Sequence, residues 1–380
     1  MAVRGQYTKA QQKMVDDTNK EADMLVGWAK SPTKMVATEE SIKNVGLSAD
    51  YWNPLWHDDN YAMNTRWGSI IAFPFFQERF GAGMFSPQAT PECGFKDYIY
   101  IGDDWELFKP VRPGDTFKVW RKRPSMEDIT SLDDKGPLRF RCVVSDLYHI
   151  NQNDELVSTF KRFMQCTFHP EPAEPVVYMP ASRYRYTKAE LEYIDRIINE
   201  EEIRGADIRY WEDVKIGDEP RPVEFGPSTT ATNQLAGGAP LIPARETIKR
   251  EPWMFVQDPD TGVYHSAIEA HQSDYAAQLM GYDGAFHFGP LARNLMARLV
   301  TNWMGDDGLI RRLKFRHMNR THIGDTAIGR GRVVNKRVEN GEYLVDLAVW
   351  LESIRGYVTE PAVATVSLCS REVAIPYKWK

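Results

Sequence analysis

The apolar residues of this 380-residue chain follow a helical repeat most clearly between positions 289 and 304. Gly289-Pro290 opens the stretch, and proline suits a first helical turn because its φ is fixed and its missing N–H is not needed there. Gly305 is placed to end the helix. Apolar side chains recur at three- to four-residue intervals, which predicts a buried helix, at Leu291, Leu295, Leu299 and Trp303 and at their neighbours Ala292, Met296, Val300 and Met304.

Alternating apolar and polar positions cover much of the remaining chain and predict half-buried strands. These runs cover 98–101, 105–108, 116–123, 138–148 and 157–168 in the first half, and 313–317, 325–337, 343–353 and 362–371 in the second. A helix expected to begin near Pro74 precedes the first series, and the 289–304 helix precedes the second. We therefore expect an α+β fold in which each half wraps an antiparallel sheet around one helix.

The two halves repeat each other at an offset of 215 residues. Trp56 and Ala62 have the spacing of His271 and Ala277, and the stretch 69–74 corresponds to 284–289. A repeat of this kind predicts two copies of one fold.

Capping residues predict shorter helices outside the repeat. An amphipathic helix is expected within 8–30, and Thr38 should cap another that ends at Gly46. Thr187 and Glu190 form a capping box, which should open a helix that closes at Gly205.

The boundary between the halves is marked by composition. Four prolines lie between positions 169 and 180, and such a segment is expected to be extended. We predict a first domain at 1–170, a proline-rich linker and helix at 171–206, and a second domain at 207–380.

The overall composition narrows the class of protein. The chain is 42% hydrophobic and 26% charged, as in soluble globular proteins, and its net charge of −6 argues against a nucleic-acid or anionic-membrane surface. No apolar run is long enough to span a membrane. The four cysteines form no CxxC pair, so we expect reduced thiols in a cytoplasmic protein, at Cys93, Cys142, Cys166 and Cys369.

Candidate chemistry gathers before the long helix. Ser273 should cap a short helix over 274–280, and His271 lies just before that cap, in a loop expected over the entrance to the 289–304 helix. A helix N-terminus offers backbone N–H groups and a positive dipole end to an anion or a developing oxyanion. Histidine is the usual general acid or base near neutral pH.

The spacing of His271, Ala277, Gly284 and Gly289 resembles the signature of the MaoC-like dehydratases and R-specific enoyl-CoA hydratases, G-D-x-N-P-[LIV]-H-x5-A followed by a glycine-rich turn. The stretches HFGPLARNLMARLVTNWMGDDG, THIGDT and GRGRVVNKRVENGEYLVDLAVW are similar to the carboxyl-terminal half of two-domain members. The resemblance implies a double hot dog fold and an acyl-thioester hydro-lyase, which hydrates or dehydrates the α,β bond of an acyl-CoA. It implies no metal and no cofactor beyond the CoA of the substrate, and a homodimer or higher homo-oligomer is the expected assembly.

The signature is incomplete in both copies. Its aspartate, asparagine and proline positions in the second copy hold Ser266, Ile268 and Glu269. The first copy keeps Asn53-Pro54 but has Tyr51 and Trp56 at the aspartate and histidine positions, with His57 one place along. The second copy is therefore expected to hold the working site.

Within that site, His271 is the expected catalytic residue. Glu269 is the first candidate for the carboxylate that activates water, and Asp283 is the second. Gly284 and Gly289 would let the backbone approach the substrate, so that N–H groups at the helix start hold the thioester oxygen. Binding roles are also assigned to His287, on the turn into the helix, and to Arg293, one turn inside it.

Several alternatives stay open. A CoA phosphate could bind the basic stretch 311–320, although a solvated strand face is the simpler interpretation. His265, Glu269 and His271 match no established metal pattern. Hot-dog thioesterases and a non-catalytic acyl-CoA-binding subunit are the rival functions. Bulky residues of the first copy could line an acyl pocket or belong to an ordinary core, namely Trp52, Trp56, Trp67, Phe73, Phe75 and Phe76.

Overall fold

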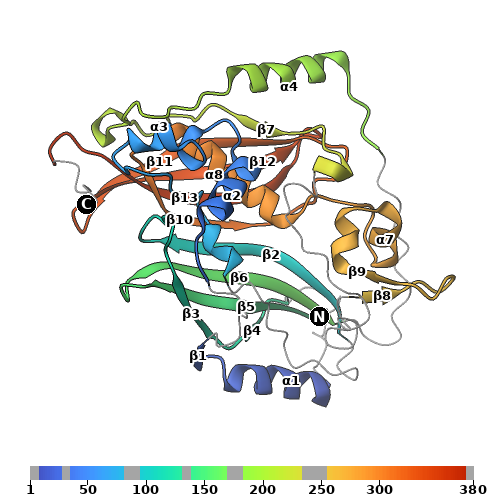
Figure 1. Cartoon of the computed structure of the whole chain (residues 1–380). Coiled ribbons are helices and arrows are strands. Elements are labelled where there is room, and N and C mark those ends of the chain that lie inside the picture. The colour runs from blue at the N-terminus through green and yellow to red at the C-terminus, as the bar shows by residue number, and fades with distance from the viewer. Residues whose placement is uncertain are drawn as a thin grey trace. The chain divides into compact units, whose positions relative to one another are not determined.

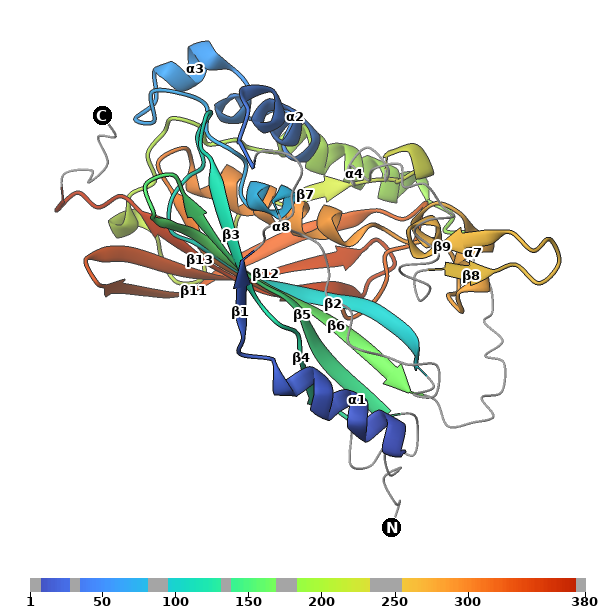
Figure 2. The ribbon, with the colours of Figure 1, turned by 60° about the horizontal axis from the view of Figure 1, so that its bottom comes forward.

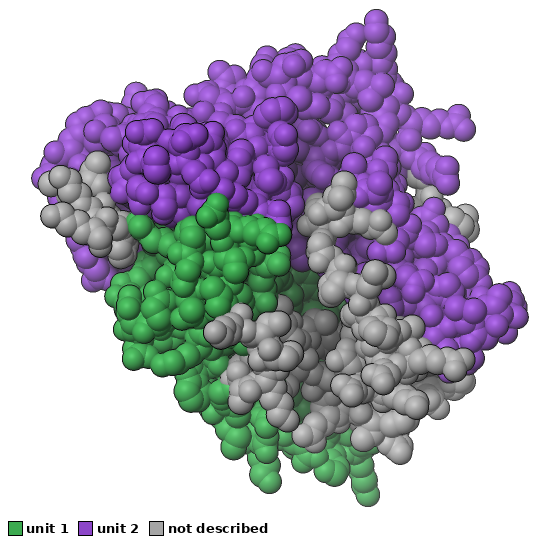
Figure 3. Space-filling model, viewed as in Figure 1, with its two compact units in different colours: residues 1–42, 75–175, 312–316 green, residues 43–74, 176–311, 317–380 purple. Residues whose placement is uncertain are grey.

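The computed structural model describes residues 8–27, 35–80, 95–130, 138–168, 183–232 and 255–373. The chain divides into two compact units (Figure 3), of which unit 1 contains residues 1–42, 75–175 and 312–316. Unit 2 contains residues 43–74, 176–311 and 317–380. The units are therefore composed differently from the predicted domains, because the stretch 43–74 groups with the second half of the chain.

Specific contacts explain why this stretch belongs to unit 2. The Tyr61 hydroxyl donates to Asp306 Oδ2 at 2.7 Å, and Trp67 Nε1 donates to the carbonyl oxygen of Asp306 at 2.8 Å. Arg66 Nε lies 3.0 Å from Asp307 Oδ1. The indole of Trp67 is buried, so these polar contacts lie in the interior of the unit.

Unit 1 is built on an antiparallel sheet (Figures 1 and 2). Its strand order is β1 (Leu25–Gly27), β3 (Phe117–Lys122), β5 (Leu138–Asn151), β6 (Leu156–Phe168) and β2 (Phe95–Leu107), with β4 (Ser125–Asp128) paired to β5. The stretch 312–316 of β10 (Leu309–Arg316) pairs with β2. The predicted strands 98–101 and 105–108 form one continuous β2, because Gly102 accommodates an irregularity there at φ 142°.

Helix α1 (Lys9–Lys20) lies along β4, as Figure 2 shows. Its Met14 enters a buried cluster that includes Phe140 and the free thiols of Cys142 and Cys166. The helix is shorter than the predicted range of 8–30, because the chain turns after Lys20 and then enters β1. The buried thiols agree with the expected reduced cysteines, and Cys93 lies outside the described residues.

Where the first central helix was expected, near Pro74, the described residues hold only a short 3₁₀ helix. The 3₁₀ helix η2 (Phe76–Arg79) follows Phe75, and residues 81–94 lie outside the described residues. The rings of this region belong to the core of unit 1. Phe75 packs on Trp105 at 5.3 Å between centroids, and Trp105 stacks on Phe160 at 4.1 Å.

Unit 2 carries the long helix on a second antiparallel sheet. The order is β13 (Val358–Leu368), β12 (Glu342–Ser353), β11 (Ala327–Glu339) and β7 (Val223–Phe225). Helix α8 (Gly289–Met304) packs against these four strands and is buried along most of its length, as its apolar repeat predicts (Figure 1). Asn340 and Gly341 both have positive φ, the type of turn that joins hairpin strands such as β11 and β12.

Two shorter helices were predicted from their caps with different success. Helix α4 (Lys188–Glu200) has the complete Thr187–Glu190 capping box. Its predicted end at Gly205 is wrong, because Glu201 adopts an extended conformation and turns its carboxylate toward Arg298 and Asn302 of α8. Helix α2 (Glu39–Ala49) follows Thr38 but continues past Gly46. The proline-rich stretch 169–180 lies outside the described residues.

The sequence offset of 215 reappears as local structure within unit 2. In the first copy, η1 (Pro54–Trp56) is followed by α3 (Asp59–Met63), whose N-cap is Asp58. In the second copy, η6 (Ala267–His271) is followed by α7 (Asp274–Leu279), whose N-cap is Ser273. The last residues of the two 3₁₀ helices, Trp56 and His271, are therefore separated by the same offset as the two N-caps, Asp58 and Ser273.

Smaller elements complete unit 2. Strands β8 (Phe255–Gln257) and β9 (Tyr264–Ser266) form a two-stranded sheet that leads into η6, and η4 (Trp211–Asp213) precedes β7. None of the helices in the described ranges is long and apolar enough to cross a membrane.

Candidate functional site

His271 ends the 3₁₀ helix η6 and is packed against the entrance to α8. Its Nδ1 lies 3.1 Å from the carbonyl oxygen of Phe286. Because a carbonyl only accepts, Nδ1 carries the proton and the lone pair of the neutral ring is on Nε2. The imidazole meets the rings of Phe286 and Phe288 edge to face, and Phe288 is the N-cap of α8. His271 is thus fixed in one tautomer at the start of the helix.

Burial lowers the pKa of His271 to about 4, and the nearby charge of His317 lowers it further. A group with such a pKa is neutral at physiological pH, so the imidazole is ready to accept a proton and is not charged.

His287 occupies the turn just before α8. Its Nε2 lies 2.7 Å from Ser228 Oγ, and Ser228 Oγ also accepts a hydrogen bond from the backbone N–H of Gly324. The ring packs edge to face on Phe225. Burial lowers the pKa of His287 to about 3, with smaller contributions from His271 and His322.

Backbone pairing brings the segment after β10 beside this turn. The N–H of His287 donates to the carbonyl of Thr321, and the N–H of Ile323 donates to that of Ala285. This pairing sets His322 Nε2 at 3.1 Å from Asp283 Oδ2, while Arg320 lies 3.7 Å from the other carboxylate oxygen. The carboxylate of Asp283 therefore faces the guanidinium of Arg320 and the imidazole of His322.

A small cavity lies under the first turns of α8. Its walls are mostly apolar, with three polar members. It is lined by Leu291, Ala292 and Leu295 of the helix, by Phe225, Ala327 and Leu351 of the sheet, and by His287, Thr321 and Glu360. The cavity brings a histidine, a threonine hydroxyl and a buried carboxylate together between apolar walls, with room for no more than about one water molecule.

Glu360 enters this cavity from β13. The side chain is 6% exposed, and its Oε1 accepts a hydrogen bond from His317 Nδ1 at 2.8 Å. The second carboxylate oxygen, Oε2, is buried and has no hydrogen-bond partner among the described residues. This residue precedes the strand predicted over 362–371 and belongs to a strand of mixed burial, so the sequence pattern does not mark it as a site residue.

The predicted binding glycines frame the helix start. Gly284 and Gly289 are both buried, and Gly289 is the first residue of α8. Among the described residues the N-cap Phe288 supplies no side-chain cap, so the first-turn N–H groups are not capped by it. Arg293 is only 3% exposed and donates to Asn294 Oδ1 at 3.2 Å, which places it in the interior of unit 2 and away from a solvent-facing phosphate.

Glu269, the first candidate for water activation, uses both carboxylate oxygens within its own loop. Oε1 accepts from the Ser266 backbone N–H at 3.0 Å as part of a capping box. Oε2 lies 2.7 Å from His265 Nδ1. Ser266, at the signature's aspartate position, completes the box. The sequence resemblance alone did not reveal this structural role.

The first copy has a different environment. Trp56, at the histidine position, donates from Nε1 to Asp50 Oδ2 at 2.9 Å and packs edge to face on Phe73. Trp52 is 73% exposed, whereas the other five bulky residues considered for an acyl pocket are buried core residues. His57 lies at the surface side of the loop, with Nε2 2.9 Å from the carbonyl of Tyr51.

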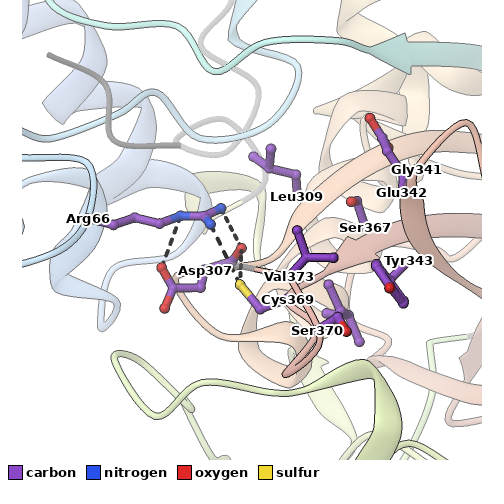
Figure 4. A pocket seen from close by; sticks show the side chains of 11 residues that line it. Arg66, Asp307, Leu309, Gly341, Glu342, Tyr343, Ser367, Cys369, Ser370 and Val373 are labelled. Atoms are coloured by element: carbon purple, nitrogen blue, oxygen red, sulfur yellow. Dashed lines mark hydrogen bonds and ion pairs between the residues drawn. The ribbon is translucent and has the colours of Figure 1, made fainter. Parts of the chain in front are cut away.

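A second pocket in unit 2 lies beyond the C-terminal end of α8 (Figure 4). Its most polar members satisfy one another. Arg66 binds Asp307 and approaches Cys369 Sγ at 3.6 Å, and Glu342 pairs with Arg311. Burial raises the pKa of the Cys369 thiol, so the sulfur is not activated as a nucleophile.

The basic stretch 311–320 is largely paired with acidic residues. Within unit 1, Arg312 and Lys314 both contact Asp104. Within unit 2, Arg311 contacts Glu342 and Arg320 contacts Asp283. These ion pairs are expected on a charged, solvent-facing strand. A CoA phosphate would have to compete with the acidic side chains for the basic ones. Over the described residues, no group of three or more His, Cys, Asp and Glu side chains is arranged to hold a metal ion.

No family model matches the sequence, and no curated protein matches it. Solved structures do match. A MaoC-like dehydratase aligns with a TM-score of 0.62 and 13% identity, over 92% of this chain and 98% of that chain. A MaoC domain protein from Chloroflexus aurantiacus J-10-fl, described as a dehydratase, aligns with a TM-score of 0.54 and 14% identity, over 92% and 95% of the two chains.

The chain has the fold of the MaoC-like dehydratases. This confirms the α+β double hot dog expected from the residues around His271. Identities of 13% and 14% establish the fold only, so the activity has to be argued from the site of this chain.

Proposed function

We propose that the chain is a hydro-lyase that adds water to, or removes it from, the α,β bond of an acyl-CoA thioester. The observation that carries the proposal is the placement of His271. Its Nδ1–H is held by the Phe286 carbonyl, and its ring packs on Phe288 at the start of α8. This puts a neutral base next to a helix N-terminus, the two elements that such a reaction needs.

In the hydration direction, Nε2 of His271 takes a proton from water while the water oxygen forms a bond to the β carbon. The electrons of the double bond move toward the thioester, and its oxygen becomes an enolate. The backbone N–H of Gly289, the first residue of α8, would stabilise that oxygen, because Pro290 has no N–H and the N–H of Leu291 donates to the carbonyl of Phe288. The imidazolium then returns the proton to the α carbon. One water molecule is consumed, and the histidine is regenerated.

The proposal is tested with the full-length protein and a panel of enoyl-CoAs and 3-hydroxyacyl-CoAs. The absorbance of the conjugated thioester follows hydration and dehydration, and a thiol reagent follows release of free CoA in parallel. Binding of a saturated acyl-CoA is measured by calorimetry. Loss or gain of conjugation without free thiol is the expected result. Free thiol would indicate a thioesterase, and binding without either change would indicate a non-catalytic subunit.

A further inference from the structure

A hydro-lyase of the proposed kind needs a second group on the water molecule, and the signature loop does not supply one. Ser266 and Glu269 form a capping box with each other, and the other oxygen of Glu269 binds His265. Ile268, at the asparagine position, has no side-chain hydrogen-bonding group. The group must therefore come from elsewhere in the fold.

Resting on the proposed function, we infer that Glu360 is the second catalytic residue and that His317 positions it. Glu360 Oε1 is held by His317 Nδ1 at 2.8 Å, which fixes the plane of the carboxylate. Oε2 is buried in the cavity under α8 without a hydrogen-bond partner among the described residues. A buried carboxylate oxygen without a partner costs free energy, so an unused acceptor in a cavity points to a bound donor.

The acceptor lies near the turn that holds His271. Glu360 shares the cavity with His287, whose neighbour Phe286 holds the His271 ring through its carbonyl. In this inference the two acceptors, a loop histidine and a strand glutamate, act together at the start of α8.

The two groups would divide the work on one water molecule. One O–H of the water faces His271 Nε2, which removes that proton as the oxygen bonds to the β carbon. The other O–H donates to Glu360 Oε2 and stays on the oxygen, becoming the hydroxyl of the product. The negative charge of Glu360 also stabilises the imidazolium that forms. In dehydration the same contacts hold the leaving water.

Asp283 is the closest rival for this role. It is the weaker candidate because its carboxylate already faces Arg320 at 3.7 Å and His322 at 3.1 Å, and it does not line the cavity. The variant D283N is therefore assayed beside the Glu360 variants.

The test uses Glu360→Gln, which keeps an amide oxygen for His317 but presents an N–H donor to water where an acceptor is needed. We expect kcat to fall on the order of 10²-fold, with KM and the binding of a saturated acyl-CoA unchanged. His317→Asn should lower kcat by less, without changing KM. Glu352→Gln is the matched control, because Glu352 is a paired carboxylate on β12 that binds Arg330. It should leave turnover unchanged.

A double variant separates catalysis from a structural effect. If His271 and Glu360 act on one water, H271A/E360Q should be no slower than the slower single variant, whereas independent effects would multiply. Thermal unfolding of each variant is recorded. If E360Q unfolds, Glu360→Asp takes its place; this variant keeps the charge but shortens the side chain, and it should retain part of the activity.

The outcomes distinguish this inference from the proposed function. Turnover by E360Q within threefold of wild type, with H271A inactive, overturns the role of Glu360 and leaves the hydro-lyase standing. The role of Glu360 is also overturned if the losses of the two single variants multiply in the double variant. It is overturned as well if D283N is inactive while E360Q is active. Absence of turnover in wild type on every thioester rejects the hydro-lyase and the role of Glu360 with it.

Discussion

Two loops of unit 2 follow the same course along the backbone and present different chemistry. One ends its 3₁₀ helix at Trp56 and caps the next helix with Asp58; the other ends at His271 and caps with Ser273. Trp56 is 2% exposed and donates to the buried carboxylate of Asp50. His271 instead donates to a main-chain carbonyl, which leaves its lone pair directed elsewhere. The same local structure therefore serves a core contact in one copy and a proposed proton transfer in the other.

The titration of the two loops differs in the same way. Burial raises the pKa of Asp50 to about 6, against the hydrogen bond from Trp56, which lowers it. Burial lowers the pKa of His271 to about 4. In both cases the neutral form is favoured in the folded protein, as expected for groups removed from water without a full counter-charge. A buried titratable group thus does not by itself identify a functional site. A functional group must also be able to reach a substrate.

The largest expected effect separates the loops by activity. His271→Ala should lower turnover by about 10²–10⁴-fold, the usual contribution of a general acid or base, with little change in the thermal midpoint. The control His57→Ala removes the histidine of the Trp56 loop and should leave turnover near wild type. Steady-state assays with an enoyl-CoA check both. Loss of turnover in H57A with an active H271A would move the site to the first copy.

For stability, the larger effect is expected from a substitution in the Trp56 loop. Trp56→Ala should lower the free energy of unfolding by about 3–5 kcal/mol, because it leaves a cavity beside Phe73 and strands the Asp50 carboxylate. Urea unfolding measures the change. Trp52→Ala, at a 73% exposed position of the same loop, is the control and should change the free energy by about 0.5 kcal/mol or less. Equal losses in the two variants would show that Trp56 is not a core residue.

The two loops should also give opposite pH dependences of stability. Because the pKa of Asp50 is raised, the folded state holds its proton longer, so its contribution to stability is present below about pH 4 and is lost as the pH rises to about 6. Because the pKa of His271 is lowered, the unfolded state binds its proton first, and stability is lost as the pH falls from about 6.5 to 4.

Unfolding measurements between pH 4 and 7 on Asp50→Asn and His271→Gln test this contrast. Relative to wild type, D50N should gain stability as the pH rises and H271Q as the pH falls, each by on the order of 2–3 kcal/mol over the window. Parallel curves for wild type and either variant would show that the group concerned does not titrate abnormally.

The smallest expected effect is one the loops share. Asp58 accepts from the N–H groups of Asn60 and Tyr61, and Ser273 accepts from that of Ala276. Asp58→Ala and Ser273→Ala should each lower the free energy of unfolding by about 1 kcal/mol, the usual value of an N-cap. Thermal or urea unfolding of the two variants provides the comparison. A difference of more than about 2 kcal/mol between them would mean that the caps are not equivalent.

Much of the fold follows from short stretches of sequence. The buried stripe and proline start of α8, the Thr187–Glu190 box of α4 and the Ser273 cap were all predicted and are present. Each of these features depends on residues that are close together along the chain, so the interactions that form it can be recognised in the sequence.

Long-range neighbours were not predictable in this way. Glu360 and His317 are 43 positions apart, and Tyr61 and Asp306 are 245 apart. The end of α4 is set by Arg298 and Asn302, about 100 positions away, so local capping signals alone suggested Gly205. The resemblance directed attention to Glu269, whose carboxylate is a local cap, and not to Glu360.

Short patterns in the sequence therefore predict the strands and helices, the double hot dog and the position of His271 before α8. The packing of distant segments determines which carboxylate shares the cavity with the helix start, and which copy has a core tryptophan hydrogen-bonded to a buried aspartate. The physical reason is that caps, turns and apolar repeats are short-range interactions along the chain. A catalytic pair requires two side chains to be brought together by the packing of a whole sheet against its helix.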